Sequence, residues 1–201
     1  MKTYIAMPNN VAKVLNSPDT YRYAALSFTP LKKGYTDSTF KQIAEYINPN
    51  KPESERTTEN FINRLKKAGL MQINEVFENG LKRNHYYIPQ PIKNFRMIKK
   101  EFLYLDLDIK LKGFLLQLLS ITINDTFQIG WSIARICREV NVSRPAATKY
   151  MKELIDKGFV KEIEGGYEII SDYFILGKTS REKEIETIRE FAKTSAYFTD
   201  R

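Results

Sequence analysis

The chain has 201 residues, a formal net charge of +8 and hydrophobic side chains at 42% of its positions. This length suits one domain or two small ones, each able to close a modest core. No stretch reaches the roughly eighteen apolar residues of a membrane span and no leader pattern opens the chain, so we expect a soluble, cytoplasmic protein with no membrane partner. With one histidine and one cysteine, a nucleophile triad or a zinc cluster of the common kinds cannot be assembled within a monomer. We therefore expect no enzyme, no cofactor, no metal and no small-molecule substrate.

In chain order, residues 4–7 form a short extended lead-in to an apolar helix near residues 21–28. Two amphipathic helices follow, and Gly69 ends the second of them. Residues 48–56, which contain proline and serine, are predicted to be an extended loop between the two helices. The apolar positions at helical spacing are Phe40, Ile43, Ala44 and Ile47 in the first helix, and Phe61, Ile62 and Leu65 in the second.

A hairpin is predicted next, because residues 72–77 and 82–88 are strand-like and flank Asn79-Gly80. Lys82, Arg83 and His85 give this hairpin positive charge, so it could lie along a DNA groove or backbone. An equally simple interpretation is a solvated hairpin tip. We interpret His85 as a residue of this hairpin and not as a catalytic base.

Pro89-Gln90-Pro91 marks a boundary, since two prolines disfavour both helix and sheet interior. After it the pattern begins again. Residues 95–98 form a second extended lead-in, and an apolar helix is predicted over residues 109–121 with Asp108 as its cap.

The stretch from 131 to 160 carries the strongest pattern in the chain. Ile133, Ile136, Cys137 and Val140 fall on one stripe of a short helix, which makes Cys137 a buried hydrophobe and not a reactive thiol. A second helix then starts at Ser143, whose side-chain oxygen is placed to cap it. Pro145 is tolerated in the first turn, and Gly158 ends the helix. The buried stripe of this second helix is Ala147, Met151 and Leu154, which leaves Arg144, Thr148, Lys149 and Lys152 outside.

Residues 159–170 read as two β-prone runs joined by Gly165-Gly166, which predicts a tight hairpin. A helix-turn-helix followed directly by a hairpin resembles the winged-helix superfamily. The resemblance implies a recognition helix in the major groove of double-stranded DNA. The alternative is an ordinary helical hairpin that packs on a β-ribbon and binds no ligand.

The same pattern occurs twice, because residues 57–71 align without a gap on residues 146–160. We therefore predict an α+β, mostly helical fold with two consecutive winged helix-turn-helix domains and a C-terminal helix. The predicted divisions are an N-terminal winged helix (1–90), a C-terminal winged helix (91–178) and an amphipathic helix (179–201).

The two predicted recognition helices differ in charge. Glu55 and Glu59 of the first would repel phosphates, whereas Arg144 of the second could pair bidentately with guanine. Base reading is therefore assigned to the second unit, and backbone contact or dimerisation to the first. Both units carry net positive charge, which favours phosphate backbones. The candidate DNA-binding residues are Ser143, Arg144, Pro145, Thr148, Lys149, Lys152, Lys82, Arg83, His85, Arg56 and Asn60.

The C-terminal helix is predicted from a capping box formed by Thr179 and Glu182. Its apolar stripe consists of Ile185, Ile188, Phe191 and Ala192. This stripe must be buried, either on its own domain or on a second copy of the chain. We expect a homodimer formed through the first unit, the tail or both. The alternative is that both winged helices of one chain occupy a single DNA site.

A narrower resemblance is carried by FRMIKKEFLYLDLDIKLKGFLLQLLS (residues 95–120) followed by the helix-turn-helix. This arrangement is similar to the DNA-binding domains of replication initiators and replisome organisers of plasmids and phages. The resemblance implies an N-terminal unit used for dimerisation and a C-terminal unit that reads origin sites. Two function classes stay open: a sequence-specific DNA-binding protein that initiates replication or controls transcription of a mobile element, and an assembly adaptor that binds no DNA.

Overall fold

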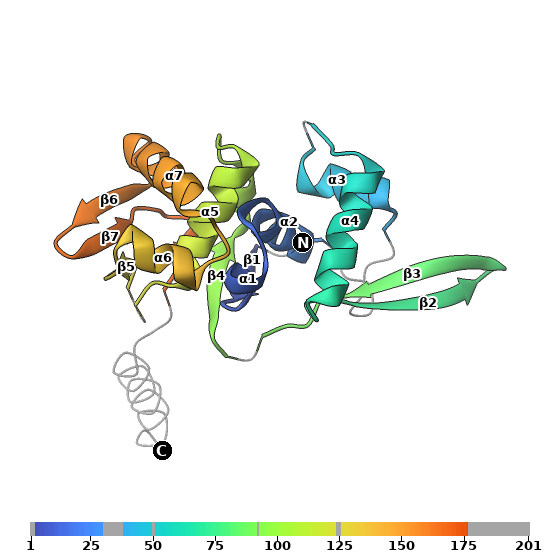
Figure 1. Cartoon of the computed structure of the whole chain (residues 1–201). Helices are drawn as coiled ribbons and strands as arrows, with labels where there is room; N and C mark the ends of the chain where they lie inside the picture. The colour runs from blue at the N-terminus through green and yellow to red at the C-terminus, as the bar shows by residue number, and fades with distance from the viewer. Residues whose placement is uncertain (1–2, 30–37, 50, 92, 124–125, 177–201) are drawn as a thin grey trace, which may run out of the picture.

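The computed structural model describes residues 3–29, 38–49, 51–91, 93–123 and 126–176. Within these residues the fold mixes seven α-helices with eight strands (Figure 1), which confirms the predicted combination of helix and strand. None of the helices in these ranges is long and apolar enough to span a membrane. The predicted C-terminal helix over 179–201 lies outside the described residues.

The first half of the chain follows the predicted order of lead-in, helix, helix pair and hairpin. Its elements are β1 (Tyr4–Pro8), α1 (Val11–Val14), α2 (Ser17–Ser27), α3 (Phe40–Ile47), α4 (Glu55–Lys67), β2 (Gln72–Glu78) and β3 (Leu81–Tyr87). The predicted loop between α3 and α4 is present, and the hairpin β2–β3 projects from the body of the molecule (Figure 1).

The second half has the same order of main elements, and the described residues before it, 88–91 and 93–94, contain neither helix nor strand. Its elements are β4 (Phe95–Lys99), a 3₁₀ helix η1 (Lys100–Tyr104), α5 (Ile109–Ser120), β5 (Gln128–Ile129), α6 (Ile133–Glu139), α7 (Arg144–Asp156), β6 (Val160–Ile163), β7 (Gly166–Ile169) and β8 (Phe174–Ile175). Asp108 caps α5 as predicted, since its carboxylate accepts a hydrogen bond from the Lys110 amide at 2.7 Å.

The two hairpins turn differently. In β2–β3 the predicted residues Asn79 and Gly80 form the turn, both with positive φ (51° and 76°), as a two-residue hairpin loop prefers. In β6–β7 the prediction of a Gly165-Gly166 turn is wrong by one residue, because Ile163 pairs with Gly166 and the loop is Glu164-Gly165. Gly166 instead allows β5 to approach, since a Cβ there would lie 1.9 Å from the Ile129 carbonyl oxygen.

The two predicted lead-ins turn out to be partners. β1 and β4 pair antiparallel, with Ile5 opposite Ile98 and Met7 opposite Arg96, and β8 adds to the other edge of β4. The sheet order is therefore β1-β4-β8, and it joins the first half of the chain to the second. Each lead-in was predicted as part of its own unit, because local sequence pattern carries no information about strand partners so distant in the chain.

The two halves also share one continuous hydrophobic core. Helices α2 and α5 cross at Gly113, where a Cβ atom would lie 1.6 Å from the Ser17 carbonyl oxygen. Beside this crossing, Gln117 accepts a hydrogen bond from the Ser17 hydroxyl at 2.6 Å and donates to the Leu15 carbonyl at 3.0 Å. The division into 1–90 and 91–178 therefore describes the repeat along the sequence, whereas the core spans both ranges.

The N-terminal segment reaches the turn between α6 and α7. The Asn141 amide donates to the Ala12 carbonyl at 3.0 Å, and the Asn141 side chain donates to the Val14 carbonyl at 3.2 Å. Lys13 and Glu139 form an ion pair at 3.1 Å. These contacts fix the position of the α6–α7 pair relative to the first half of the chain.

Candidate nucleic-acid interface

Helix α7 begins where the sequence predicts. Ser143 occupies the N-cap position with extended backbone (φ −71°, ψ 149°), and Pro145 lies in the first turn. The side chain of Ser143 makes no capping hydrogen bond, however, contrary to prediction. One physical reason is that Pro145 at the second helical position has no N–H, so one of the two amides that a cap oxygen usually accepts from is missing.

The end of α7 is closed by a glycine motif. Gly158 has a φ of 75°, its amide donates to the Ile155 carbonyl, and the Phe159 amide donates to the Leu154 carbonyl, both at 2.9 Å. This pair of hydrogen bonds satisfies carbonyls that the helix leaves without partners. The chain then enters β6 at once, which places the second hairpin next to the end of α7.

Packing decides which side of α7 is exposed. Ala147, Met151 and Leu154 are buried as predicted, and the Tyr150 ring packs against the Phe114 ring of α5 with centroids 5.6 Å apart. The structure brings the six predicted positions on and before α7 together on its exposed side: Ser143, Arg144, Pro145, Thr148, Lys149 and Lys152.

This cationic surface covers the N-terminal part of the helix. Thr148 donates its hydroxyl hydrogen to the Arg144 carbonyl at 3.0 Å, which leaves the hydroxyl oxygen outward as an acceptor. Asp156, one turn after Lys152, and Lys157 at the C-cap are also exposed, so the charge at the C-terminal end of the helix is mixed. A helix in a major groove contacts bases mainly through its N-terminal residues, so the charge lies where such contacts are made.

Sequence reasoning missed two further arginines. Arg135 and Arg138 are exposed on α6, and the Arg135 guanidinium lies 4.5 Å from the centre of the Trp131 ring. In a helix-turn-helix the first helix crosses the DNA backbone, so these two cations are candidate phosphate contacts. They could have been found by listing cations opposite the Ile136 and Val140 stripe.

The hairpin β6–β7 contributes little net charge. Lys161 is exposed, but its ammonium forms an ion pair with Glu168 on the neighbouring strand at 2.8 Å. Glu162 and Glu164 are also exposed on this hairpin. Within the segment from α6 to β7, the unpaired positive charge therefore lies mainly on the helices and not on the hairpin.

Helix α4 has the same position in the first half but a different surface. The predicted contact residues Arg56 and Asn60 are exposed, as are Glu55 and Glu59 beside them. The helix is held by a buried carboxylate, because Asp19 of α2 accepts hydrogen bonds from Arg22 and from Arg64 of α4, each at 2.6 Å. These contacts hold α4 against α2, while the exposed charge of α4 is mixed.

The structure supports only some of the three DNA-binding residues predicted on the hairpin β2–β3. Arg83 is exposed. His85 is only 6% exposed, so the prediction that it contacts DNA does not fit its position. Its neighbour Tyr86 is buried too, which means that the base of β3 is covered on both faces and not on one. Lys82 pairs with Phe77 across the hairpin, and its side chain lies outside the described part of the structure.

Neither the cysteine nor the potential metal ligands form a reactive site in the residues that the structure describes. Burial raises the pKa of the Cys137 thiol, and the nearby Arg144 lowers it by less. A thiol with a raised pKa is a poor nucleophile, although Cys137 is only partly buried and not fully buried as predicted. Among the described residues, no three His, Cys, Asp or Glu side chains are grouped as metal ligands would be.

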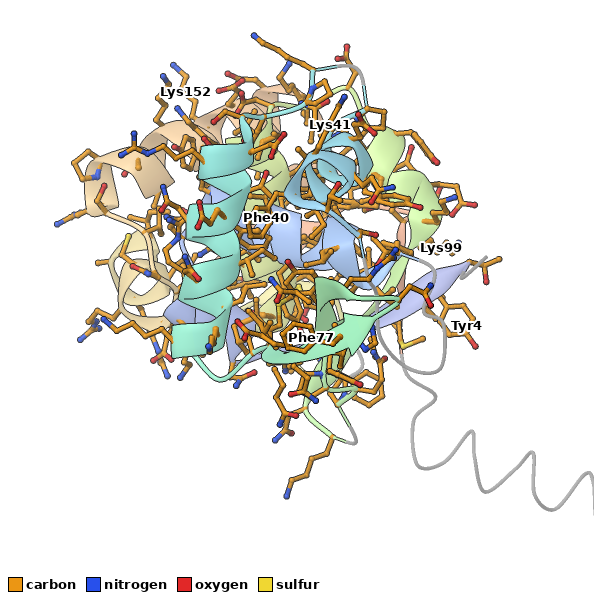
Figure 2. The ribbon with its side chains drawn as sticks, turned by 90° about the vertical axis from the view of Figure 1, so that its right-hand side faces the viewer. Tyr4, Phe40, Lys41, Phe77, Lys99 and Lys152 are labelled. Atoms are coloured by element: carbon orange, nitrogen blue, oxygen red, sulfur yellow. The ribbon has the colours of Figure 1, made fainter. Side chains whose placement is uncertain are left out.

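Helices α7 and α4 lie on either side of α5 and α2 (Figure 1). In Figure 2, Lys152 of α7 lies toward the left of the view, and Tyr4 and Lys99 of the β1–β4 pair lie toward the right. A duplex bound at Lys152 would therefore leave Tyr4 and Lys99 uncovered.

Comparison with known proteins gives one match. Residues 131–161, which include α6, α7 and the start of β6, match the family described as winged helix-turn-helix DNA-binding. No curated protein and no solved structure matches the chain. The match covers the segment in which the exposed cations of α6 and α7 lie, and a winged helix-turn-helix DNA-binding domain is therefore found at residues 131–161.

Proposed function

We propose that this chain binds double-stranded DNA sequence-specifically and acts without catalysis. In this proposal α7 enters the major groove, Arg144 pairs with a guanine, and Lys149 and Lys152 contact phosphates. The observation that carries the proposal is the exposed cationic surface of α7 within the segment that matches the DNA-binding family.

The first half is proposed to be a second winged helix. Support comes from the order α2, α3, α4 and β2–β3, which repeats as α5, α6, α7 and β6–β7. Helices α4 and α7 have equal length, and their bounds differ by one constant offset in residue number. Arg56 and Asn60 are exposed on α4, so this helix could contact a duplex through them.

Salt-dependent binding tests the proposal first. The purified chain is titrated with mixed-sequence duplexes at several salt concentrations, and affinity should fall steeply as salt rises because bound cations release counterions from phosphates. Selection from random duplexes then gives the preferred site. Arg144→Ala should relax preference at one base pair and cost about 1–3 kcal/mol of binding free energy, whereas Asn60→Ala should cost much less.

The biological process is proposed by resemblance. Replication initiation or transcription control of a mobile element would suit a chain with two winged helices. A selected site that recurs as a directly repeated array beside the gene supports replication initiation, and a single site overlapping a promoter supports transcription control.

An assembly adaptor is the second candidate, and two observations favour it for the first half. Glu55 and Glu59 are exposed on α4, and the Phe77 side chain on β2–β3 is 78% exposed. Absence of DNA binding at low salt would favour the adaptor over the first proposal.

Self-association of the chain is proposed through the same hairpin. Phe77→Ser should shift sedimentation toward the monomer, because an exposed aromatic ring gains by burial between two copies. Tyr104→Ser is the matched control, since Tyr104 is 69% exposed on η1 in the second half. A wild type that stays monomeric at every concentration would contradict this part of the proposal.

A further inference from the structure

The sheet β1-β4-β8 has two unlike faces. Ile5, Ile98 and Phe174 align across the three strands on the inner face, where all three are buried. The alternate residues form the outer face, in which Ala6, Met97 and Ile175 align across the strands. Together the outward positions are Tyr4, Ala6, Pro8, Phe95, Met97, Lys99 and Ile175, and we call this set the outer sheet face.

The outer sheet face is apolar at every position except Lys99. Antiparallel sheets with one face toward water usually place polar residues there, so a second layer normally covers a face of this composition. Tyr4 is 54% exposed, Ile175 is 38% exposed, and Leu176 next to it is 40% exposed. Tyr4 and Lys99 also lie on the opposite side from Lys152 (Figure 2), so a duplex bound to α7 would not cover them.

We propose that the outer sheet face is the docking surface for the C-terminal segment of the same chain, bound as an amphipathic helix over residues 180–193. The described part of the chain ends at Leu176, directly after Ile175, so the segment starts at the rim of this face. The apolar stripe Ile185, Ile188, Phe191 and Ala192 then supplies the missing second layer.

Length and charge fit this occupant. A helix of about fourteen residues is roughly 21 Å long, and a five-residue strand is roughly 17 Å long, so one helix can cover the strands along their length. Glu184 precedes Ile188 by four residues and therefore lies in the same stripe of a helix. The stripe thus offers one carboxylate to the single ammonium of the outer sheet face, that of Lys99.

Disulfide trapping in the full chain tests this docking. In a Cys137→Ser background, Met97→Cys is combined separately with Ile185→Cys, Ile188→Cys and Phe191→Cys, because a disulfide needs Cα atoms within about 7 Å and the docking register sets which pair meets that limit. At least one pair should form an intrachain disulfide at low protein concentration, about tenfold above the control, since docking raises the effective concentration of the two thiols.

Two controls make the result specific. Met97→Cys with Glu186→Cys places the tail thiol on the opposite side of the helix, and Asn79→Cys with Ile188→Cys places the partner thiol at the exposed turn of β2–β3. Both pairs should stay reduced. The proposal is overturned if all three stripe pairs remain at control level, or if their disulfides join two chains, which would make a second copy the occupant.

Hydrogen exchange gives a readout that does not depend on cysteines. Amides of residues 180–193 should be protected in the full chain, and Ile188→Asp should remove that protection while Lys183→Asp, on the opposite side of the helix from the stripe, leaves most of it. Unprotected amides in the wild type would overturn the proposal. All these variants should keep the DNA affinity of the wild type, so failure of this docking and failure of the proposed function are distinguishable.

Discussion

Helices α4 and α7 are built alike and present different surfaces. Each has thirteen residues, follows an N-cap serine and ends at a glycine with positive φ, 68° at Gly69 and 75° at Gly158. The C-terminal ends of both helices are closed by the same two hydrogen bonds. In one of them the Leu70 amide donates to the Leu65 carbonyl, as the Phe159 amide does to the Leu154 carbonyl. The exposed residues nevertheless differ in charge. The sequence signals that determine where a helix begins and ends are therefore separate from those that determine what it binds. Function has to be argued from the exposed residues.

Exchanging the charges of the two helices should have the largest effect. Arg144→Glu with Thr148→Glu gives α7 the carboxylates found at the equivalent positions of α4, and we expect DNA affinity at low salt to fall by about 100-fold or more. The reverse exchange, Glu55→Arg with Glu59→Thr, should raise affinity by about tenfold at most. Fluorescence anisotropy with the selected duplex measures both. Equal losses from the two exchanges would mean that both helices bind DNA in the same way.

The next largest effect is expected from Gly113→Ala, measured as a loss in the free energy of unfolding. A Cβ atom at this position would overlap the Ser17 carbonyl of α2, so helices α2 and α5 must separate, at a cost of about 3 kcal/mol in the free energy of unfolding. Gly130→Ala is the control, because a Cβ there meets only the Ile123 side chain at 3.8 Å. Urea unfolding gives both values. A single transition that moves to lower urea supports a shared core, and a transition split in two would indicate halves that unfold separately.

The two terminal glycines should behave as a matched pair. Gly69→Ala and Gly158→Ala place a Cβ in open space but at positive φ, which costs about 1–2 kcal/mol by backbone strain alone. Urea unfolding should therefore show similar losses for both variants. A loss at only one glycine would show that the two helix ends are less alike than their hydrogen bonds indicate.

The smallest expected effect is a difference in stability between variants of the two N-cap serines, Ser54 and Ser143. The Ser54 side chain accepts a hydrogen bond from the Thr57 amide at 3.2 Å, whereas Ser143 makes no such bond. Ser54→Ala should lower the free energy of unfolding by about 1 kcal/mol, and Ser143→Ala by a few tenths. Thermal unfolding of the DNA-free protein measures this difference. Equal losses would show that Ser143 caps its helix in solution.

Local signals in the sequence were sufficient for most elements. Stripes of apolar residues located α4, α6 and α7, and glycines marked the ends of α4 and α7, because helical periodicity and positive φ are properties of a few consecutive residues. The hairpin β2–β3 followed from Asn79-Gly80 for the same reason. The exposure of Arg144, Lys149 and Lys152 was predictable because it is the complement of a buried stripe on the same helix.

Contacts between distant residues were not predictable. The sequence of Tyr4–Pro8 does not identify Phe95–Lys99 as the strand that pairs with it. The sequence near Asn141 likewise does not indicate a hydrogen bond to Ala12. His85 was misplaced because strand alternation assumes one covered face, while the base of β3 has two. The misplaced β6–β7 turn has a similar origin, since the approach of Ile129 to Gly166 comes from another strand.

The pairing of β1 with β4 has a consequence for how the protein is made. A ribosome that adds about 5–20 residues per second needs roughly 5–18 s to go from Tyr4 to Phe95, and longer to reach β8. During that interval Ile5 and Met7 have no strand beside them, and α2 has no α5 to cross. The nascent N-terminal half therefore cannot complete its own core, and the native fold is finished only when nearly all of the chain has been synthesised.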